Sequence, residues 1–398
     1  MSKRVLIMSA STGGGHNRAA RAIKEELESR TINNMPIKCE IVDSLKLVNN
    51  TMDKVISRGY EKSAIYTPKA YGSVYRLSET NLASRNEFKG NPLTSLMARK
   101  FKHLLNDSKP DLIIGTHPFP MIALSTLKKH SNLNTLNLGE SFIKNSKVDV
   151  PPMISVLTDY TTHSTWIQNE IDYYIVGHEY VKELLVYEGV NGEKVKSFGI
   201  PVEKSFLDHR DKETVLTELG LSPDKLTVLL MGGSFGAGNI KETLEDLLTI
   251  DRDFQVLVVT GRNEHLKDKL SKMLDSTIQD KNICLLGYTD KMNDILASID
   301  VLISKPGGLT TTEALLNDVP MIVPYFIPGQ EEENLDFLTN CGAALRTTKK
   351  YSLPVLLKVL IDDPSRLDML RKNIKSIRKF DSAVNISNLV VDILDNNK

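Results

Sequence analysis

The sequence predicts an α/β protein with two doubly wound lobes, each a parallel sheet covered by helices. Short apolar runs alternate with amphipathic helical stretches along most of the 398 residues, which is the pattern of strands joined by helical crossovers. A glycine-rich turn follows the first apolar run of each half, at 11–16 and at 232–238. The chain is also long enough for about two domains with separate cores.

The expected strands are apolar runs of three to seven residues. Those of the first lobe lie near 4–9, 37–43, 111–115, 153–158, 173–176 and 195–198, and those of the second near 227–231, 255–260, 282–285, 301–303 and 320–324. Glycine and proline at 199–202 interrupt regular structure, so the chain is expected to cross between lobes there. Helices are expected near 353–361, 366–379 and 382–395. The predicted domains are therefore an N-terminal lobe (1–202), a C-terminal lobe (203–370) and a terminal helical segment (371–398) that can return to the first lobe.

Composition narrows the classes of protein. The formal net charge is zero, but the first 100 residues hold 17 Lys+Arg and 9 Asp+Glu, which indicates attraction to an anionic surface rather than simple solubility. No nucleic-acid partner is expected. Three cysteines without metal-ligand spacing favour neither a disulfide framework nor a zinc site. No secretory signal precedes the first strand, and no apolar run approaches the ~20 residues that span a bilayer. We therefore expect a cytoplasmic protein.

Residues 304–334 carry the most specific signal. A buried strand runs into the turn Lys305-Pro306-Gly307-Gly308, and a helix is expected to start near 310–312 with Glu313 on its first turn. Glycine turns at helix N-termini bind anions because unpaired N–H groups and the helix dipole meet there. A carboxylate one turn into the helix suits a ribose diol. A second strand and an acid- and amide-rich loop, with Gln330, Glu331 and Asn334, complete a predicted nucleotide-sugar pocket.

A second glycine turn, at 232–238, follows the strand near 227–231. It contains Gly232, Gly233, Ser234, Phe235 and Gly236 and precedes a helix expected at 240–248. Taken alone, such a turn is equally well explained by the geometry of a tight strand–helix connection. Two glycine turns about seventy residues apart in one α/β unit favour shared phosphate binding.

The third glycine turn follows the first strand and includes Gly14 and Gly15. His16 comes next, at the start of a helix expected over 17–29. It would lie at the carboxyl end of the first strand, where open α/β sheets bind ligands. An ordinary pKa near 6.5 suits a general base. The alternative is that His16 caps the helix or binds the acceptor without moving a proton.

Residues 45–105 interrupt the α/β pattern. Apolar residues recur there at helical spacing, and Lys54, Arg58 and Lys62 form a basic stripe. Basic, aromatic and aliphatic residues together suit a surface that rests in a lipid headgroup layer. The alternative is an ordinary amphipathic helix packed on its own lobe.

Eight motifs in order resemble glycosyltransferase family 28, in the branch of the monogalactosyldiacylglycerol synthases and the bacterial diacylglycerol glucosyltransferases. They are STGGGH (11–16), THPFP (116–120), LTDYTTHSTW (157–166), FGIPV (198–202), LLMGGSFGAG (229–238), TGRN (260–263), SKPGG (304–308) with Glu313, and PGQEEEN (328–334). The resemblance implies the GT-B fold, with an acceptor lobe, a donor lobe and an interlobe cleft.

The resemblance also implies roles for the donor-lobe residues. Gly232–Gly236 and Lys305–Gly308 would cradle the diphosphate, with Arg262 and Asn263 nearby; Glu313 would bind the ribose; the chain at Tyr288 would contact uracil; Gln330 and Glu331 would grip the sugar hydroxyls; and Asn334 would support their loop.

In the acceptor lobe the resemblance makes His16 the base and associates Pro118 and Trp166 with anionic lipid. An amphipathic tryptophan ring suits a headgroup layer; the alternative is that Trp166 is a packing residue of the core. Asp159 either orients a catalytic group or caps a turn.

The implied reaction is an inverting transfer of a hexose from a UDP-sugar to 1,2-diacylglycerol, which forms a β-linked glycolipid. UDP-glucose is favoured over UDP-galactose, no cofactor or metal is expected, and the enzyme would act peripherally at the inner face of the cell membrane. Three alternatives stay open: transfer of N-acetylglucosamine to a polyprenyl-pyrophosphate precursor, UDP-sugar 2-epimerisation, and a non-catalytic UDP-sugar sensor.

Overall fold

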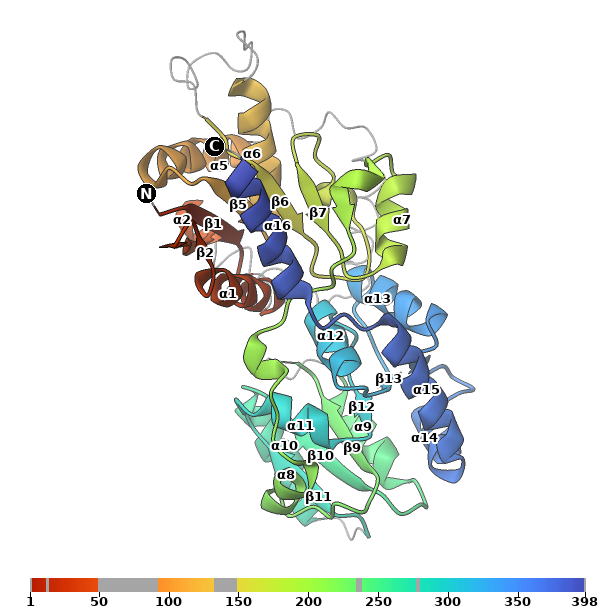
Figure 1. Ribbon diagram of the computed structural model, residues 1–398. Helices are drawn as coiled ribbons and strands as arrows, with labels where there is room; N and C mark the ends of the chain where they lie inside the picture. Colours follow the sequence, from red (N-terminus) through yellow and green to blue (C-terminus); the bar gives the residue numbers. More distant parts are fainter. Residues whose placement is uncertain are drawn as a thin grey trace. The chain divides into compact units, whose positions relative to one another are not determined.

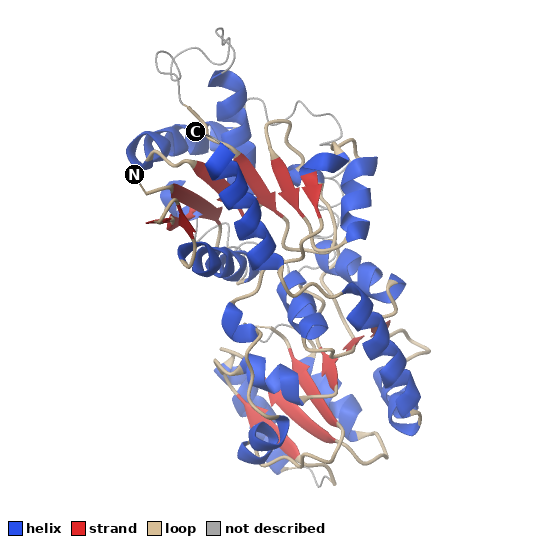
Figure 2. Ribbon diagram, in the orientation of Figure 1, coloured by secondary structure: helices blue, strands red, loops and turns tan. Residues whose placement is uncertain are grey.

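The computed structural model describes residues 2–11, 14–48, 92–131, 149–233, 238–276 and 280–396. The chain divides into two compact units, Met1–Lys204 with Lys379–Lys398 (unit 1), and Ser205–Arg378 (unit 2). Each unit holds a six-stranded parallel sheet flanked by helices (Figures 1 and 2). The predicted fold class, two doubly wound α/β lobes, is thereby confirmed.

The sheet of unit 1 has the strand order β4-β1-β5-β6-β7-β8. Its strands are β1 (Arg4–Ser9), β4 (Lys38–Asp43), β5 (Leu112–Gly115), β6 (Met153–Val156), β7 (Tyr173–Ile175) and β8 (Val195–Lys196), all close to the predicted ranges. Strands β5 and β6 are buried at every residue, as expected of strands covered on both faces. The order of the strands reverses between β1 and β5, and ligands of open α/β sheets bind at such a switch point.

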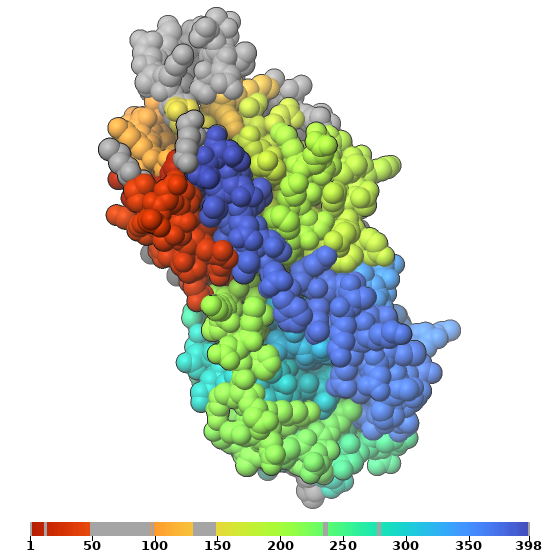
Figure 3. All heavy atoms as spheres, viewed as in Figure 1, coloured from red at the N-terminus to blue at the C-terminus, as the bar shows by residue number. Residues whose placement is uncertain are grey.

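The helices of unit 1 include one from the far end of the chain. They are α1 (Gly15–Glu28), α2 (Ser44–Val48), α5 (Pro92–Ser108), α6 (Pro118–Ser131), α7 (Glu179–Tyr187) and α16 (Ser382–Asn396), with 3-10 turns at η1 (Ser164–Trp166) and η2 (Gly192–Lys194). Ile386, Val390 and Leu394 of α16 share a core cluster with Ile23 and Leu27 of α1, and Figure 3 shows the C-terminal segment beside the first residues of the chain. The last helix therefore belongs to unit 1.

Unit 2 has the strand order β11-β10-β9-β12-β13-β14. Its strands are β9 (Thr227–Met231), β10 (Gln255–Val259), β11 (Ile283–Leu286), β12 (Val301–Ile303), β13 (Met321–Val323) and β14 (Ala344–Arg346). Numbered within the unit, this is the 3-2-1-4-5-6 order of dinucleotide-binding folds, with its switch point between β9 and β12. Strand β14 and a two-strand hairpin in unit 1, β2 (Thr31–Ile32) with β3 (Met35–Pro36), were not predicted.

The helices of unit 2 follow its strands in alternation. They are α8 (Lys212–Glu218), α9 (Ile240–Leu248), α10 (Glu264–Asp275), α11 (Met292–Ser298), α12 (Gly308–Leu316), α13 (Gln330–Asn340), α14 (Leu353–Asp362) and α15 (Pro364–Ile377), with the 3-10 turn η3 (Lys204–Phe206) at the unit boundary. Helix α15 runs to Ile377, so the units divide after it, between Arg378 and Lys379, and not at 370, which lies within this helix.

Two details of the predicted pocket are wrong. Helix α12 begins at Gly308, directly after an extended Gly307, so Glu313 lies on its second turn and not on its first. Gln330, Glu331 and Asn334 belong to α13 and not to a loop. Three glutamates fill the first turn of α13, where carboxylates complement the helix dipole. The composition that suggested a loop therefore stabilises a helix N-terminus.

We expect Gly199→Ala to destabilise unit 1 by about 3 kcal/mol, because two costs add. Gly199 has a φ of +97°, and a Cβ there would lie 2.6 Å from Cβ of Lys379. Its carbonyl also accepts a 2.7 Å hydrogen bond from Ser382 Oγ, which ties α16 to the unit. Urea unfolding followed by circular dichroism measures the loss. As a control, Gly220→Ala incurs only the backbone cost of about 1–2 kcal/mol, since its φ is +70° and no atom lies within 4 Å of the added Cβ. Equal losses in the two variants would contradict the argument.

Among the described helices, none has both the length and the apolar character needed to cross a membrane.

Candidate functional site

His16 lies at the switch point of the unit 1 sheet. It is the second residue of α1, directly after the glycine turn that follows β1. Its Nδ1 is 2.7 Å from the carbonyl oxygen of Thr116, at the end of β5, and 2.9 Å from Oγ1 of Thr158, just past β6. The carboxyl ends of three neighbouring strands therefore converge on one imidazole.

These contacts fix the tautomer of His16. A carbonyl oxygen only accepts, so the proton is on Nδ1 and is shared with the Thr158 hydroxyl. The lone pair is then on Nε2, the atom that would act as a base. Burial lowers the pKa of His16 below its ordinary value of 6.5, while the Asp159 carboxylate and the Thr116 carbonyl raise it. The ring is therefore neutral at pH 7 and able to accept a proton.

His117 buttresses this imidazole. The two rings meet edge to face with centroids 4.6 Å apart, and Thr116 Oγ1 donates a 3.1 Å hydrogen bond to the carbonyl of His16. Burial, and then the neighbouring His16, hold the pKa of His117 well below 6.5. The half-buried Pro118 begins α6 next to it. The Thr116–Pro118 segment thus holds His16 in place from the β5 side.

We expect the free energy of unfolding to fall as the pH drops below about 6.5, because His16 and His117 are neutral in the fold and protonate when unfolded. Their folded pKa values are lowered, so the unfolded chain binds more protons in this window. Each histidine then contributes a slope of up to about 1.4 kcal/mol per pH unit. Urea titrations between pH 7.5 and 5.5 measure the slope. His117→Gln should flatten it, whereas His103→Gln, at an exposed position of α5, should not; unchanged slopes in both would refute the assignment.

The residues associated with acceptor or lipid binding have different environments. Gly14 caps α1, Gly15 is its first residue, and Asp159 acts electrostatically on His16. Trp166 is only 3% exposed, so the expectation that its ring faces a headgroup layer is wrong: the ring is a core residue of unit 1. Trp166 ends the 3-10 turn η1, which packs against α6. Lys54, Arg58 and Lys62 lie outside the described residues.

In unit 2, Lys305 lies between the two glycine turns at the switch point of the sheet. A Cβ built on Gly233 would be 3.6 Å from Cε of Lys305, and one built on Gly307 would be 4.0 Å from its Nζ. Gly232 and Gly233 follow β9, and Lys305 follows β12, the two strands that flank the switch point. Lys305, Pro306, Gly307 and Gly308 therefore bring a cation and the N-terminus of α12 to one place. Ser234, Phe235 and Gly236 lie outside the described residues.

The first turn of α13 packs against this cation. Lys305 Nζ forms an ion pair with Glu331 Oε1, and Glu331 Oε2 accepts a 2.9 Å hydrogen bond from the Ile327 amide. Asn334 is fully buried, and its Nδ2 donates to the Pro306 carbonyl at 3.0 Å. The residues assigned to the sugar and those assigned to the diphosphate thus form one connected group, with Gln330 at the start of the same helix.

The remaining predicted donor residues follow three strands of the same sheet. Glu313 is 4% exposed on α12. The Arg262 guanidinium, after β10, lies 5.1 Å from the centroid of the Tyr288 ring, after β11. Asn263 caps α10, since its Oδ1 accepts a 3.0 Å hydrogen bond from the Leu266 amide. The cap gives Asn263 a structural role and leaves Arg262 and Tyr288 as the exposed pair on this side of the sheet.

Sequence reasoning missed Thr116, Thr158 and His117. All three stand inside motifs that the sequence made conspicuous, and each follows a buried strand. The available signal was therefore their position at strand ends. Which of them would contact His16 depended on the order of the strands, which the sequence did not give.

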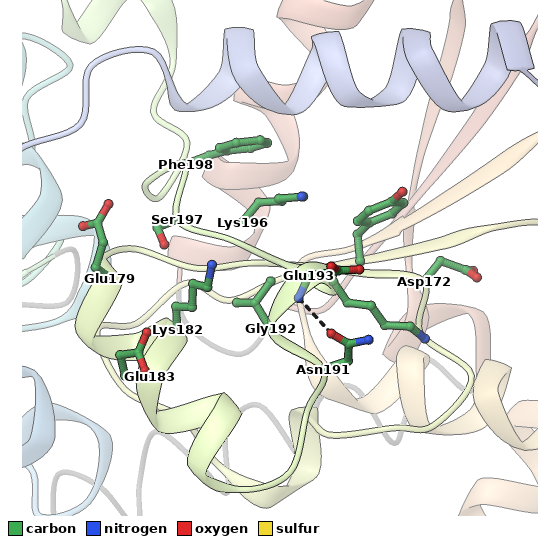
Figure 4. A pocket seen from close by; sticks show the side chains of 13 residues that line it. Asp172, Glu179, Lys182, Glu183, Asn191, Gly192, Glu193, Lys196, Ser197 and Phe198 are labelled. Carbon is green, nitrogen blue, oxygen red and sulfur yellow. Dashed lines mark hydrogen bonds between the residues drawn. The ribbon is translucent and has the colours of Figure 1, made fainter.

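One groove lies elsewhere, along the edge strand β8 and helix α7 of unit 1. It has a volume of about 1110 Å³ and mixes lysines with carboxylates, including Lys182, Lys196, Glu183 and Glu193 (Figure 4). None of the residues assigned to donor, acceptor or catalysis lines it. Within the described ranges, no group of His, Cys, Asp or Glu has the arrangement of a metal site.

Comparison with known proteins agrees with this architecture. The sequence profile of monogalactosyldiacylglycerol (MGDG) synthase matches residues 16–202, and that of the glycosyltransferase family 28 C-terminal domain matches residues 227–380. The processive diacylglycerol β-glucosyltransferase of Bacillus licheniformis is 31% identical over 96% of this chain and 92% of its own length. The enzyme of the same name from Bacillus subtilis is 30% identical over 96% of this chain and 93% of its own.

Solved structures extend the likeness in fold. MurG of Acinetobacter baumannii aligns with a TM-score of 0.59 at 13% identity, over 97% of this chain and 99% of its own. UDP-GlcNAc 2-epimerase of Neisseria meningitidis, bound to UDP-GlcNAc, aligns with a TM-score of 0.60 at 13% identity, over 98% and 100%. Anabaena HepE in complex with UDP-glucose aligns with a TM-score of 0.55 at 12% identity, over 99% of both chains.

The two sheets and the two profiles define the class as a glycosyltransferase of GT-B fold. Full-length similarity to the Bacillus enzymes narrows the class further. The chain belongs to glycosyltransferase family 28, in the branch of the monogalactosyldiacylglycerol synthases and the diacylglycerol β-glucosyltransferases. The family predicted from the motifs is thereby confirmed.

Proposed function

We propose that this enzyme transfers a hexose, with glucose favoured over galactose, from a UDP-sugar to 1,2-diacylglycerol, with inversion, to form a β-monoglycosyldiacylglycerol. The observation that carries the proposal is the position of the His16 imidazole, which is held through Nδ1 at the carboxyl edge of the unit 1 sheet and keeps Nε2 for a substrate proton. The relatives that match this chain over its full length are named diacylglycerol β-glucosyltransferases, and this motivates the choice of glucose.

In the proposed reaction, His16 Nε2 removes the proton from the free hydroxyl of diacylglycerol. The hydroxyl oxygen forms a bond to the anomeric carbon as the bond from that carbon to the UDP oxygen breaks. One displacement from the face opposite UDP converts an α-linked donor into a β-linked product. The Asp159 carboxylate would stabilise the imidazolium that results, because it already raises the pKa of His16.

The leaving group would be stabilised in unit 2. Lys305 and the N-terminus of α12 supply positive charge and N–H groups at the switch point, where charge on the departing diphosphate develops. Buried Glu313 is assigned to the ribose, Gln330 and Glu331 to the sugar, and Arg262 and Tyr288 to the nucleotide side. The acceptor lobe would be unit 1, which includes the returning C-terminal segment, and the donor lobe would be unit 2.

Because diacylglycerol is a membrane lipid, the enzyme is proposed to work peripherally at the inner face of the cell membrane. Anionic lipid would attract the basic N-terminal segment, including Lys54, Arg58 and Lys62. Pro118 stays a proposed lipid contact, since it is partly exposed. No metal or cofactor is assigned to the reaction.

The test is a transfer assay with purified full-length protein, radiolabelled donor and diacylglycerol dispersed in detergent. UDP-glucose should give a labelled monoglycosyldiacylglycerol, with UDP-galactose as the competing donor. A lipid product with a polyprenyl-pyrophosphate acceptor and UDP-GlcNAc, or epimerised UDP-GlcNAc without any lipid, would overturn the proposal in favour of the corresponding activity. Binding of UDP-glucose with no transfer to any acceptor would favour a sensor.

A further inference from the structure

Helix α14 of unit 2 is apolar on nearly all sides although one of its faces is open to solvent. Its ten residues, LPVLLKVLID, include one lysine and one aspartate. Leu353, Leu357 and Leu360 are buried in the core cluster of unit 2, and the helix lies beside α15 (Figure 1). A helix that is apolar all round is normally buried or in contact with lipid.

The exposed side of α14 carries an apolar stripe. Tyr351, Val355 and Val359 follow one another at a spacing of four residues and are 61%, 44% and 42% exposed. The position of the stripe is fixed, because the opposite face of α14 packs into the core of unit 2. Tyr351 is anchored as well: its carbonyl accepts a 2.9 Å hydrogen bond from the Thr348 amide, and its own amide donates to Thr348 Oγ1 at 3.0 Å.

Lysines border this stripe. Lys349 and Lys350 are exposed at the tip of the turn that Thr348 and Tyr351 close, and Lys358 stands on α14 itself. Across the described part of the chain, no salt bridge within 4.0 Å involves any of these three lysines. The surface therefore combines exposed apolar side chains with an excess of positive charge.

The carboxylates at the end of α14 do not cancel that charge. Asp362 pairs with Arg252, whose Nε is 2.6 Å from Oδ1, and Asp363 pairs with Arg366 at 3.1 Å. Each acid is thus matched by an arginine, although Lys358 also acts electrostatically on Asp362. The net charge of the surface remains that of its lysines.

We propose that this surface, formed by Lys349, Lys350, Tyr351, Val355, Lys358 and Val359, docks unit 2 on an anionic lipid bilayer. Valines would enter the boundary between headgroups and acyl chains, the tyrosine would sit at headgroup level, and the lysines would meet lipid phosphates. The inference deepens the proposed function, on which its biological purpose rests, because it gives the donor-side unit its own contact with the membrane that holds the acceptor.

A second copy of the chain fits this surface less well. A second copy of the chain docking face to face would place the same three lysines against each other, and three exposed apolar side chains are few beside the ~20–30 residues a side of a stable interface.

Vesicle sedimentation with the full-length protein tests the proposal. The probes are phosphatidylglycerol–phosphatidylcholine vesicles and pure phosphatidylcholine vesicles, both without diacylglycerol. Neutralising the three lysines together (Lys349→Gln, Lys350→Gln, Lys358→Gln) should weaken binding to the anionic vesicles by up to about 100-fold, since each lysine near such a surface contributes about fivefold. Replacing the apolar stripe (Tyr351→Ser, Val355→Ser, Val359→Ser) should also weaken it.

The matched control neutralises three exposed lysines elsewhere in unit 2 (Lys269→Gln, Lys272→Gln, Lys291→Gln), and it should bind like the parent. Unchanged vesicle binding in both test variants, or a parent dimer that the serine variant dissociates, would overturn the proposal. Transfer to detergent-dispersed diacylglycerol is measured in parallel. Its absence in the parent protein would count against the proposed function, and a vesicle defect with transfer intact would separate docking from catalysis.

Discussion

His16→Ala is expected to lower kcat/KM for glycosyl transfer by about 10²–10⁴-fold, the usual contribution of a positioned general base. The variant removes Nε2, the nitrogen that would accept the proton. Nδ1 cannot take this role, because it contacts Thr116 and Thr158. UDP affinity should not change, since the residues assigned to the nucleotide belong to unit 2. Initial rates with UDP-glucose and diacylglycerol, combined with calorimetry of UDP binding, measure the two effects separately.

Two further variants control for this loss. His103→Ala removes an exposed histidine of α5 and should retain full activity. Thr158→Val keeps the shape of the side chain but removes one of the two partners of Nδ1, and so should reduce the rate less than His16→Ala does. Turnover at the parental rate in the His16 variant would exclude His16 as the base, whatever happened to UDP binding.

Most strands of the two sheets were predictable, because each is a short apolar run. Val301–Ile303 and Thr227–Met231 are buried throughout, and such apolar runs between glycine turns read as central strands of a parallel sheet. Strand β14 was missed for the opposite reason. Its three residues, Ala344–Arg346, run from buried to exposed at the sheet edge, so neither periodicity nor hydrophobicity marks them.

The order of the strands in each sheet could not be predicted from the sequence, and this order determines which residues meet at the site. His16 meets Thr116 because β5 pairs with β1, a partnership between residues about one hundred positions apart. Lys305 meets the glycine turn after β9 because β12 pairs with β9. The motifs marked the glycine turns, His16 and Lys305, but only the long-range pairing of strands shows which threonines surround the imidazole. The roles of these residues in binding and catalysis are still predictions.

Trp166 shows where residue chemistry alone misleads. An amphipathic ring in a sequence that points to a lipid substrate favours an interfacial position. The structure packs the ring into unit 1 instead, with 3% exposure. Conversely, the exposure of the α14 valines was not predicted, because an apolar helix is expected to be buried and its sequence does not show which face stays exposed. Burial is set by neighbouring elements, so neither outcome could be read from the local sequence.

Lys305→Met should weaken UDP binding by about 10- to 100-fold and lower kcat by about 10²–10³-fold, because the same ammonium would hold the diphosphate in the ground state and stabilise its developing charge as it leaves. Methionine is nearly as long as lysine but carries no charge. A Cβ built on Gly233 or on Gly307 lies 3.6–4.0 Å from the Lys305 side chain, so the variant leaves both glycine turns without a cation. Calorimetry with UDP and initial rates at saturating diacylglycerol separate the two losses.

A second variant, at Glu331, distinguishes two causes of weaker UDP binding: loss of the Lys305 ammonium and repulsion by the Glu331 carboxylate. Without the ammonium, the Glu331 carboxylate keeps its hydrogen bond from the Ile327 amide but faces the diphosphate with an uncompensated negative charge. If repulsion by Glu331 caused the defect, adding Glu331→Gln to Lys305→Met would restore UDP binding. We expect the double variant to stay weak, because neither side chain then supplies positive charge, while Lys272→Met on the exposed side of α10 binds normally. Parental affinity in the single Lys305 variant would remove this lysine from the diphosphate site and leave the glycine-turn amides as its only support.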